Sequence, residues 1–159
     1  MTGQALYSQL PEELDKRNGF KDIKMMSDVT QYEGLEYNGD IEDEKFKNLS
    51  LYLAKKDYYT TIGTVKVHEV EVLAYKGEVY KIRVVTDKDT KLYGGLKQAF
   101  GEPNFSPRSN NYYWATDNLV LIYKSHSKNK LELTYQSYLI EEKLKMEKKE
   151  EIETISEDF

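Results

Sequence analysis

The chain of 159 residues contains no cysteine, only two histidines and a single tryptophan. The lack of cysteine excludes disulfides, thiol nucleophiles, CxxC redox motifs and cysteine-ligated zinc. The longest apolar run covers only residues 119–123, whereas a membrane-spanning helix needs about 18 or more apolar residues. The sequence also lacks the GxxxxGKS/T, GxGxxG, GxSxG and HExxH motifs. This excludes the common phosphate-binding loops and hydrolase motifs.

Size and composition indicate one folded domain. The mass of 18.6 kDa is typical of a single domain, and 39% of the residues are hydrophobic, which is enough for one core. Charged residues make up 32% of the chain and the mean hydropathy is −0.74, as in soluble folded proteins. We expect a domain over residues 1–150, with residues 1–18 loosely attached, followed by an acidic, frayed tail at residues 151–159.

The negative charge is concentrated near the C-terminus. The formal net charge is −5, and residues 141–159 contribute −4 of it through eight acidic residues and four lysines. The first 140 residues are therefore almost neutral and contain no basic stripe. Because binding to a nucleic-acid backbone depends on clustered lysine and arginine, we expect no nucleic-acid partner.

The N-terminus has neither the basic nor the apolar region of a signal peptide. One interpretation is that Met1, Thr2 and Gly3 stand where a leader was removed, which favours a periplasmic or secreted location over a cytoplasmic one. The absence of disulfides is compatible with both. Residues 48–50 (NLS) form a glycosylation sequon, relevant only in a source that has that machinery.

The first 50 residues predict short elements. We expect a helix over residues 8–17 capped by Ser8, and a strand within residues 20–25. A helical turn over residues 27–32 follows. Residues 38–40 (NGD) are typical of a turn, and the charged residues 41–47 indicate a loop or a sheet edge.

A strand beginning at Ile62 has the clearest alternation of apolar and polar residues. Its alternation slips by one residue at His68-Glu69, which predicts a β-bulge. A two-residue turn at Lys76-Gly77 leads to a second strand over residues 80–85. The slip and the turn together predict a bulged hairpin.

A helix follows, in which Thr86 and Asp87 serve as caps and Leu92, Leu96 and Phe100 share one face. Three further strands are expected, and their positions are residues 111–115, 119–123 and 131–136. The last of them alternates, which predicts one solvated face. A final helix begins at Leu139. These elements predict an α+β fold, with an antiparallel sheet of hairpin-connected strands and helices packed on one face.

Tyrosine is the most over-represented residue, with 14 copies. The densest segments contain Tyr58, Tyr59, Tyr112, Tyr113 and Trp114. One interpretation is an exposed platform that stacks on sugars or anchors a protein partner. The other is that one ring face belongs to the core and the opposite ring covers a half-buried sheet, because tyrosine also favours strands. Both interpretations stay open.

No other group of residues forms a recognisable site. Residues 87–90 (DKDT) resemble the strand-then-DxD start of haloacid-dehalogenase-type phosphatases, but Thr90 occupies the glycine position, so we interpret the aspartates as helix caps. His68 and His126 have no partners that complete a catalytic triad or a metal site. The acidic residues 38–44 lack the ligand spacing of a calcium loop. We therefore expect no metal and no cofactor.

The C-terminal helix carries a broken apolar stripe on an otherwise charged surface. Its members are Ile140, Leu144, Ile152, Ile155 and Phe159. Such a helix docks into the groove of a partner or covers its own sheet. For residues 140–146 we expect packing on the chain's own domain.

Two segments and their surroundings cover about a quarter of the chain. They are residues 19–24 (GFKDIK), which precede a Ser27-capped turn, and residues 100–103 (FGEP), which lead to Trp114. They resemble small, uncharacterised exported or lipoprotein-like bacterial domains of the Bacteroidota type. Met25-Met26 stands where those domains usually have a leucine-glycine step. The resemblance implies an α+β fold and export, and it carries over no functional residues.

From these observations we expect a non-catalytic binding or interaction domain rather than an enzyme. Its binding surface would contain Tyr58, Tyr59, Tyr112, Tyr113 and Trp114, and its ligand would be a protein or a glycan. One alternative is a protein inhibitor or immunity-type protein whose acidic surface binds a basic enzyme. The other is a hydrolase with two carboxylates about 5–10 Å apart in a cleft.

Overall fold

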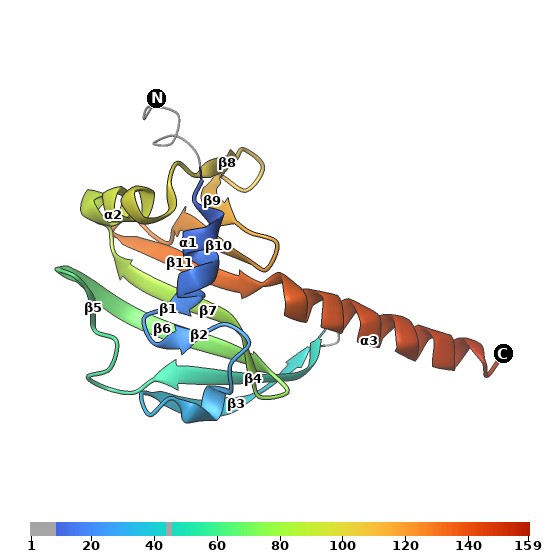
Figure 1. Ribbon diagram of the computed structural model, residues 1–159. Helices are drawn as coiled ribbons and strands as arrows, with labels where there is room; N and C mark the ends of the chain where they lie inside the picture. Colours follow the sequence, from blue (N-terminus) through green and yellow to red (C-terminus); the bar gives the residue numbers. More distant parts are fainter. Residues whose placement is uncertain (1–8, 44–45) are drawn as a thin grey trace.

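The computed structural model describes residues 9–43 and 46–159 (Figure 1). Its helices are α1 (Pro11–Arg17), the 3-10 helix η1 (Val29–Gln31), α2 (Thr90–Phe100) and α3 (Tyr138–Ser156). Its strands are β1 (Gly19–Phe20), β2 (Ile23–Lys24), β3 (Leu35–Asp43), β4 (Phe46–Ala54), β5 (Thr61–Ile62), β6 (Val65–Tyr75), β7 (Glu78–Asp87), β8 (Asn104–Ser106), β9 (Asn111–Ala115), β10 (Leu119–Ser125) and β11 (Lys130–Ser137). The strands pair antiparallel, which confirms the predicted α+β fold.

The large sheet consists of two meanders that meet at its centre. Its strand order is β3-β4-β6-β7-β11-β10-β9-β8, and β5 pairs with β6. The first meander runs from the β3 edge inward to β7. Helix α2 then carries the chain to the opposite edge, from which the second meander returns to β11. β7 and β11 pair along seven residues, from Asp87 opposite Lys130 to Lys81 opposite Gln136.

Helices α1 and α2 lie on the same face of this sheet, which we call the helix-covered face (Figure 1). Val84 of β7 lies opposite Leu133 of β11, and Leu121 of β10 lies opposite Tyr135 of β11; all four belong to one buried cluster. Leu14 of α1 and Leu96 of α2 belong to the same cluster. The apolar residues that α2 repeats every fourth position therefore bury themselves against the sheet, as the sequence predicted.

Helix α3 packs on the domain only at its start. The Ser137 hydroxyl caps it by accepting a hydrogen bond from the Ile140 amide at 3.2 Å. The fully buried Ile140 joins a second, smaller cluster with Leu49, Tyr75 and Tyr80. The packing expected over residues 140–146 is therefore present as far as Leu144, whereas Met146 is 55% exposed.

The remainder of α3 projects away from the sheet (Figure 1). Glu147 forms an ion pair with Lys76 at 2.5 Å, and every residue after Glu147 is exposed. The helix nevertheless continues to Ser156, whereas the sequence predicted a frayed tail from residue 151. No helix among residues 9–43 and 46–159 is long and apolar enough to span a membrane.

The hairpin of β6 and β7 has the predicted bulge and turn, but its first strand begins at Val65, whereas Ile62, the predicted start, lies in β5. The register of the hairpin shifts between Val67 and Glu69, which confirms the bulge at His68-Glu69. Lys76 and Gly77 make the turn, both at positive φ. Residues 86–87 do not cap α2 as predicted, because β7 continues through Asp87 to pair with β11.

The cap of α2 is Asp89, whose carboxylate accepts a hydrogen bond from the Lys91 amide at 2.8 Å. Gly101 follows the last residue of the helix, as predicted. Asp28 caps η1 in the same way, by accepting a hydrogen bond from the Thr30 amide at 2.9 Å. Residues 86–87 therefore belong to the strand, and Asp89 caps the helix.

The region before residue 55 contains more strand than the sequence predicted. Residues 35–43 and 46–54 pair as the edge hairpin β3-β4, and the expected turn at residues 38–40 is instead a register shift between Tyr37 and Asp40. Gly39 has a φ of 112°, which glycine adopts without steric cost. Residues 20–25 form the small hairpin β1-β2 and not one strand. The cap predicted at Ser8 lies outside the described residues.

Candidate functional site

Four aromatic rings gather beside α2, where β8, β9 and β10 lie side by side. We call this group the aromatic patch. Its members are Tyr93, Phe105, Tyr112 and Tyr123. Tyr112 is its centre and contacts the other three, with ring centroids 5.1 Å from Phe105, 5.5 Å from Tyr93 and 6.3 Å from Tyr123. These tilted contacts lie in the range that favours aromatic pairs.

Strand register explains how the aromatic patch forms. Tyr112 lies opposite Phe105 in β8 and opposite Tyr123 in β10, so the three rings stand in a row on the helix-covered face. Tyr93 reaches the row from α2, next to the buried Leu92 that fixes this side of the helix on the sheet. One helix and three strands, each supplying one ring, therefore build the patch.

The aromatic patch is open to solvent at one end. Phe105 is 49% exposed and Tyr112 is 38% exposed, whereas Tyr93 and Tyr123 are half-buried. Burial raises the pKa of the Tyr93 and Tyr123 hydroxyls above their ordinary value, so both stay neutral at physiological pH. A charged group borders the rings, because Lys97 lies 5.4 Å from the Tyr93 ring centre and 3.3 Å from Glu102. The surface is thus apolar with a polar margin.

Trp114 does not belong to this surface, and the expectation that it forms a binding surface is wrong. It shares the helix-covered face with Tyr112, but only 1% of it is exposed. Its indole Nε1 donates a hydrogen bond to the Gly101 carbonyl at 2.8 Å, and its ring packs on Phe100. The end of α2 covers this part of β9, whereas Tyr112, which α2 contacts only through Tyr93, stays 38% exposed. Tyr113 points to the opposite face and is half-buried.

The predicted residues Tyr58 and Tyr59 lie far from the aromatic patch in the fold, in the loop between β4 and β5. Both rings pack over Gly34, where even a Cβ atom would lie 2.5 Å from Tyr58 and 2.8 Å from Tyr59. Burial, together with a hydrogen bond to Asp22, raises the pKa of the Tyr59 hydroxyl. Tyr59 therefore contributes to packing, and Tyr58 keeps an exposed edge. A binding role for either residue stays a prediction.

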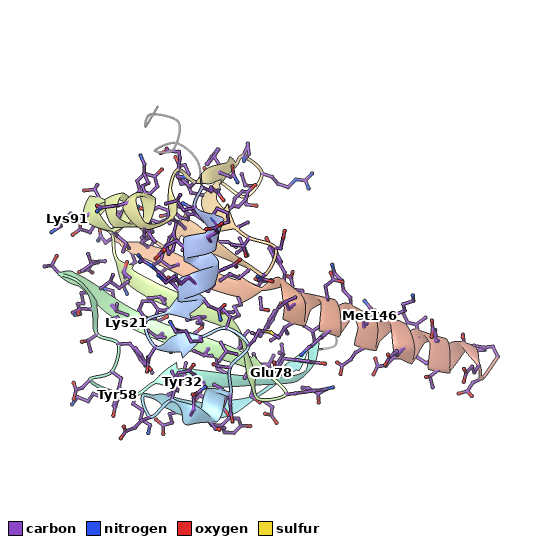
Figure 2. All side chains as sticks on the ribbon, viewed as in Figure 1. Lys21, Tyr32, Tyr58, Glu78, Lys91 and Met146 are labelled. Carbon is purple, nitrogen blue, oxygen red and sulfur yellow. The ribbon has the colours of Figure 1, made fainter. Side chains whose placement is uncertain are left out.

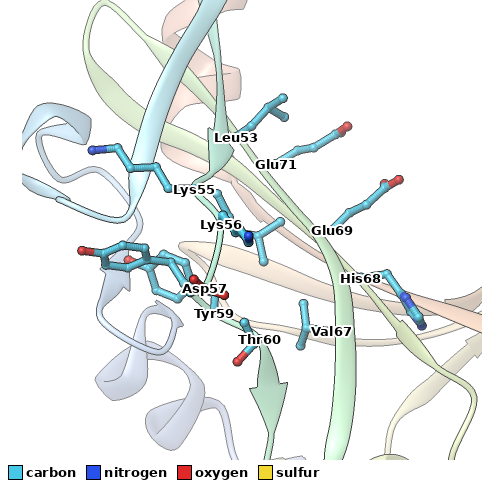
Figure 3. A pocket seen from close by; sticks show the side chains of 13 residues that line it. Leu53, Lys55, Lys56, Asp57, Tyr59, Thr60, Val67, His68, Glu69 and Glu71 are labelled. Atoms are coloured by element: carbon cyan, nitrogen blue, oxygen red, sulfur yellow. The ribbon is translucent and has the colours of Figure 1, made fainter.

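The loop that holds these tyrosines borders a pocket of about 370 Å³ beside β6 (Figure 3). Figure 3 shows Glu69 and Glu71 pointing to the same side of β6. Both carboxylates lie 3.1 Å from one guanidinium nitrogen of Arg83. His68 points elsewhere, and its Nε2 lies 2.5 Å from an Asp87 carboxylate oxygen. The two glutamates are thus engaged in ion pairs, which differs from the free carboxylate pair that a hydrolase needs.

A charge network continues from this pocket across the sheet to Glu132. This glutamate is 6% exposed and accepts a hydrogen bond from Arg83 Nε at 2.5 Å, and Lys124 Nζ lies 3.1 Å away. Burial opposes ionisation of Glu132, but these two cations outweigh it and hold the pKa of its carboxyl below the ordinary value. His126 lies at the margin, with Nδ1 3.7 Å from Glu132. The cations of this network thus neutralise the buried carboxylate of Glu132.

No three histidine, aspartate or glutamate side chains come close enough to hold a metal ion in the part of the chain that the structure describes. The acidic residues 38–43 are part of strand β3. Comparison of the chain with protein-family models, curated proteins and solved structures finds no match. Functional inference therefore depends on the surface itself, and the aromatic patch is its strongest feature.

Proposed function

We propose that this protein is a non-catalytic binding domain that recognises a protein partner through the aromatic patch. The single observation that carries the proposal is a contiguous group of four rings, two of them well exposed. Tyrosine and phenylalanine dominate interface hot spots because they bury large apolar areas at low cost in side-chain entropy. The two exposed rings, Phe105 and Tyr112, have the composition of such an anchor.

The hairpin that carries the patch supports a protein partner over a glycan. Residues 104–113 (NFSPRSNNYY) combine aromatic residues with asparagine, serine and arginine, and Arg108 is exposed at the hairpin tip. This mixture of rigid rings and adaptable hydrogen-bonding groups is typical of antibody paratopes. We therefore expect Phe105 and Tyr112 to bind as apolar anchors, with the polar residues around them as the rim.

The test compares two variants of the full chain. One is the double variant Phe105→Ser/Tyr112→Ser, which removes the exposed rings. The other is the control Tyr37→Ser, which removes a tyrosine that is 53% exposed, more than either exposed ring of the patch, from β3 at the opposite edge of the sheet. Each immobilised protein is incubated with an extract of the source cells, and any captured partner is then purified and titrated by calorimetry.

We expect the patch variant to weaken binding of the purified partner at least about 30-fold, the effect of losing one hot spot. The Tyr37→Ser control should bind like the unmodified protein. Equal affinity of all three proteins would contradict the proposal. Binding to a glycan array that depends on Phe105 and Tyr112, without any protein partner, would replace protein recognition by carbohydrate recognition.

The projecting part of α3 favours a second candidate function, recognition of a basic protein such as an enzyme that this chain would inhibit. Residues 148–159 are exposed and carry more acidic than basic side chains. An acidic surface steers a basic partner and makes the association rate sensitive to salt. In that case the rate should fall steeply between 50 and about 300 mM salt, and Phe105→Ser/Tyr112→Ser should leave it unchanged.

A further inference from the structure

A groove of about 560 Å³ opens on the helix-covered face, on the other side of α2 from the aromatic patch. Its walls come from α2, from the β1–β2 hairpin and from the β5–β6 hairpin, and its floor comes from β11. Figure 2 labels Lys91 on α2 and Lys21 beside β1, two of the residues that border it. Its volume is in the range of small-molecule sites.

The floor of the groove is apolar. It consists of Leu133 and Tyr135, and the adjoining walls add Phe20, Leu92, Leu96 and Phe100; all six side chains also belong to the main core. Phe20 and Tyr135 contact each other, with ring centroids 6.4 Å apart. An alkyl chain lying here would remove apolar surface from water at both partners, which is favourable by about 25 cal/mol per Å².

The rim of the groove is positively charged. Arg17, Lys21, Lys24 and Lys91 line it, and no aspartate or glutamate does among the described residues. Arg17 is neutralised by Glu13 at 2.8 Å. Lys91 Nζ lies 3.4 Å from the Thr64 hydroxyl on the β5–β6 hairpin and 3.8 Å from an Asp89 oxygen.

Lys21 and Lys24 are the cations available to a ligand. Lys24 Nζ donates hydrogen bonds to the carbonyls of Arg17 and Lys21, at 2.8 and 3.1 Å, and these contacts leave its charge uncompensated. Lys21 Nζ lies 5.9 Å from the Phe20 ring centre. Within the described residues, no ion pair with a carboxylate is formed by either lysine. On a chain with a net charge of −5, this rim is complementary to an anion.

Gly95 keeps the groove open at the α2 wall. A Cβ atom at this position would meet nothing within 4 Å, so any larger side chain would occupy the groove. Glycine inside a helix costs about 1 kcal/mol relative to alanine. The neighbouring Gly94 is also unobstructed but does not line the groove, which makes it a matched control.

We propose that this groove binds an apolar monocarboxylate, of the chemical class of a medium-chain fatty acid. The alkyl chain lies on the apolar floor and the carboxylate forms ion pairs with Lys21 and Lys24. A charge-assisted hydrogen bond at one end and an apolar chain along the floor distinguish this ligand from a neutral alcohol and from a small inorganic anion. The site shares no residue with the aromatic patch, so a failure of one proposal does not contradict the other.

The experiment titrates the full chain with decanoate and with decanol by calorimetry, both below the concentration at which they aggregate. Decanoate should bind at least tenfold more tightly than decanol. The variant Lys21→Gln/Lys24→Gln should lose at least tenfold in affinity for decanoate and should bind decanol as before. Equal affinity for the two ligands, or binding only to vesicles that contain phosphatidylglycerol, would overturn the proposal.

A second pair of variants tests the location. Gly95→Leu should reduce decanoate affinity at least tenfold because leucine fills the groove, and Gly94→Leu should leave it unchanged. Both variants replace a helical glycine in open space, so both should remain folded with a melting temperature no lower than that of the unmodified protein. Unchanged binding in a folded Gly95→Leu variant would place the ligand elsewhere and overturn the proposal.

Discussion

The burial of Glu132 depends on a partner that is distant in the sequence. Alternation in residues 131–136 predicted that Glu132 faces solvent, yet it is buried. The reason is Arg83, which lies in the neighbouring strand β7 and supplies the opposite charge. The sequence shows no relation between these two positions, because their pairing depends on which strands become neighbours. Alternation therefore placed Glu132 on the correct face of its strand, but the prediction that Glu132 is solvated there was wrong.

Replacing Glu132 should make the unfolding free energy less dependent on pH. The pKa of Glu132 is lowered in the folded state, so its stabilisation is fully present above the ordinary value of 4.5 and is lost as the pH falls through the folded-state value. We expect Glu132→Gln to cost about 3 kcal/mol at pH 7, at the lower end for breaking a buried ion pair. The difference from the unmodified protein should shrink below pH 4.5.

Urea denaturation from pH 7 to pH 3 measures this effect. The control is Glu142→Gln, which removes an exposed carboxylate that pairs with Lys145 at 3.5 Å. Exposed pairs contribute little, so this variant should change the unfolding free energy by less than about 0.5 kcal/mol. A Glu132→Gln variant that behaves like this control would show that the charge network contributes nothing to stability.

The tyrosine-rich segment shows a second limit at the residue scale. Alternation placed Tyr112 and Trp114 on one face, as the structure has it. One of them is nevertheless buried and the other exposed, because the end of α2 packs on Trp114 through Phe100 and Gly101, whereas Tyr112 is flanked by the half-buried Tyr93 and the exposed Phe105. The sequence indicated that aromatic residues gather here. It could not indicate that Tyr93 and Tyr123 complete the patch, since they come from a helix and another strand.

At the scale of elements, α3 combines an anchored start with an exposed end. Ile140 is fully buried, whereas the apolar Met146, Ile152 and Ile155 are more than half exposed. The apolar stripe in the sequence was therefore read correctly for the first turns. In the later turns the stripe faces solvent, since the helix has left the sheet and has no surface of the domain to cover.

Removing residues 150–159 should leave the domain equally stable. The deletion should shift the unfolding free energy by less than about 0.5 kcal/mol, as for other exposed positions, while reducing the helical signal at 222 nm. Ile140→Ala should cost about 2–4 kcal/mol because it empties a site in the second cluster. Thermal unfolding followed by circular dichroism measures both, and a truncated chain that melts like Ile140→Ala would contradict the prediction.

The edge hairpin β3-β4 was predicted only in part, because residues 41–47 indicated a loop or a sheet edge. Residues 38–40 have the composition of a turn, and charged residues follow them, as in a loop. An edge strand tolerates both features, because its outer side faces water and a glycine accommodates a bulge. By contrast, the β6-β7 hairpin was predicted with its bulge and turn, since its residues are buried on a regular alternation.

At the scale of the whole molecule, the two meanders share one core. Val72 of the first meander and Leu121 of the second belong to the same buried cluster, as does Leu14 of α1. Hairpins and helices were predictable from local patterns. The order of the strands was not, because the central pairing of β7 with β11 joins segments that are distant in the chain and that could have paired with other edges.

A shared core predicts that the molecule unfolds in a single cooperative step. Trp114 reports on β9 in the second meander, and its buried position should give a blue-shifted emission that acrylamide quenches poorly. Its fluorescence change in urea should coincide with the loss of far-ultraviolet ellipticity, which reports on the whole chain. Two separate midpoints would mean that the meanders unfold independently.

The central pairing also has a consequence during protein synthesis. Strand β7 is complete at Asp87, but its partner β11 ends only at Ser137, so 50 residues must still be added before the pairing can close. At about 5–20 residues per second, a ribosome needs roughly 3–10 s for this stretch. Throughout that interval the nascent first meander exposes the free edge of β7, with Ile82 and Val84 beside it. The nascent chain is then open to pairing with neighbouring chains on a polysome, and chaperone binding to this edge would give β11 time to arrive.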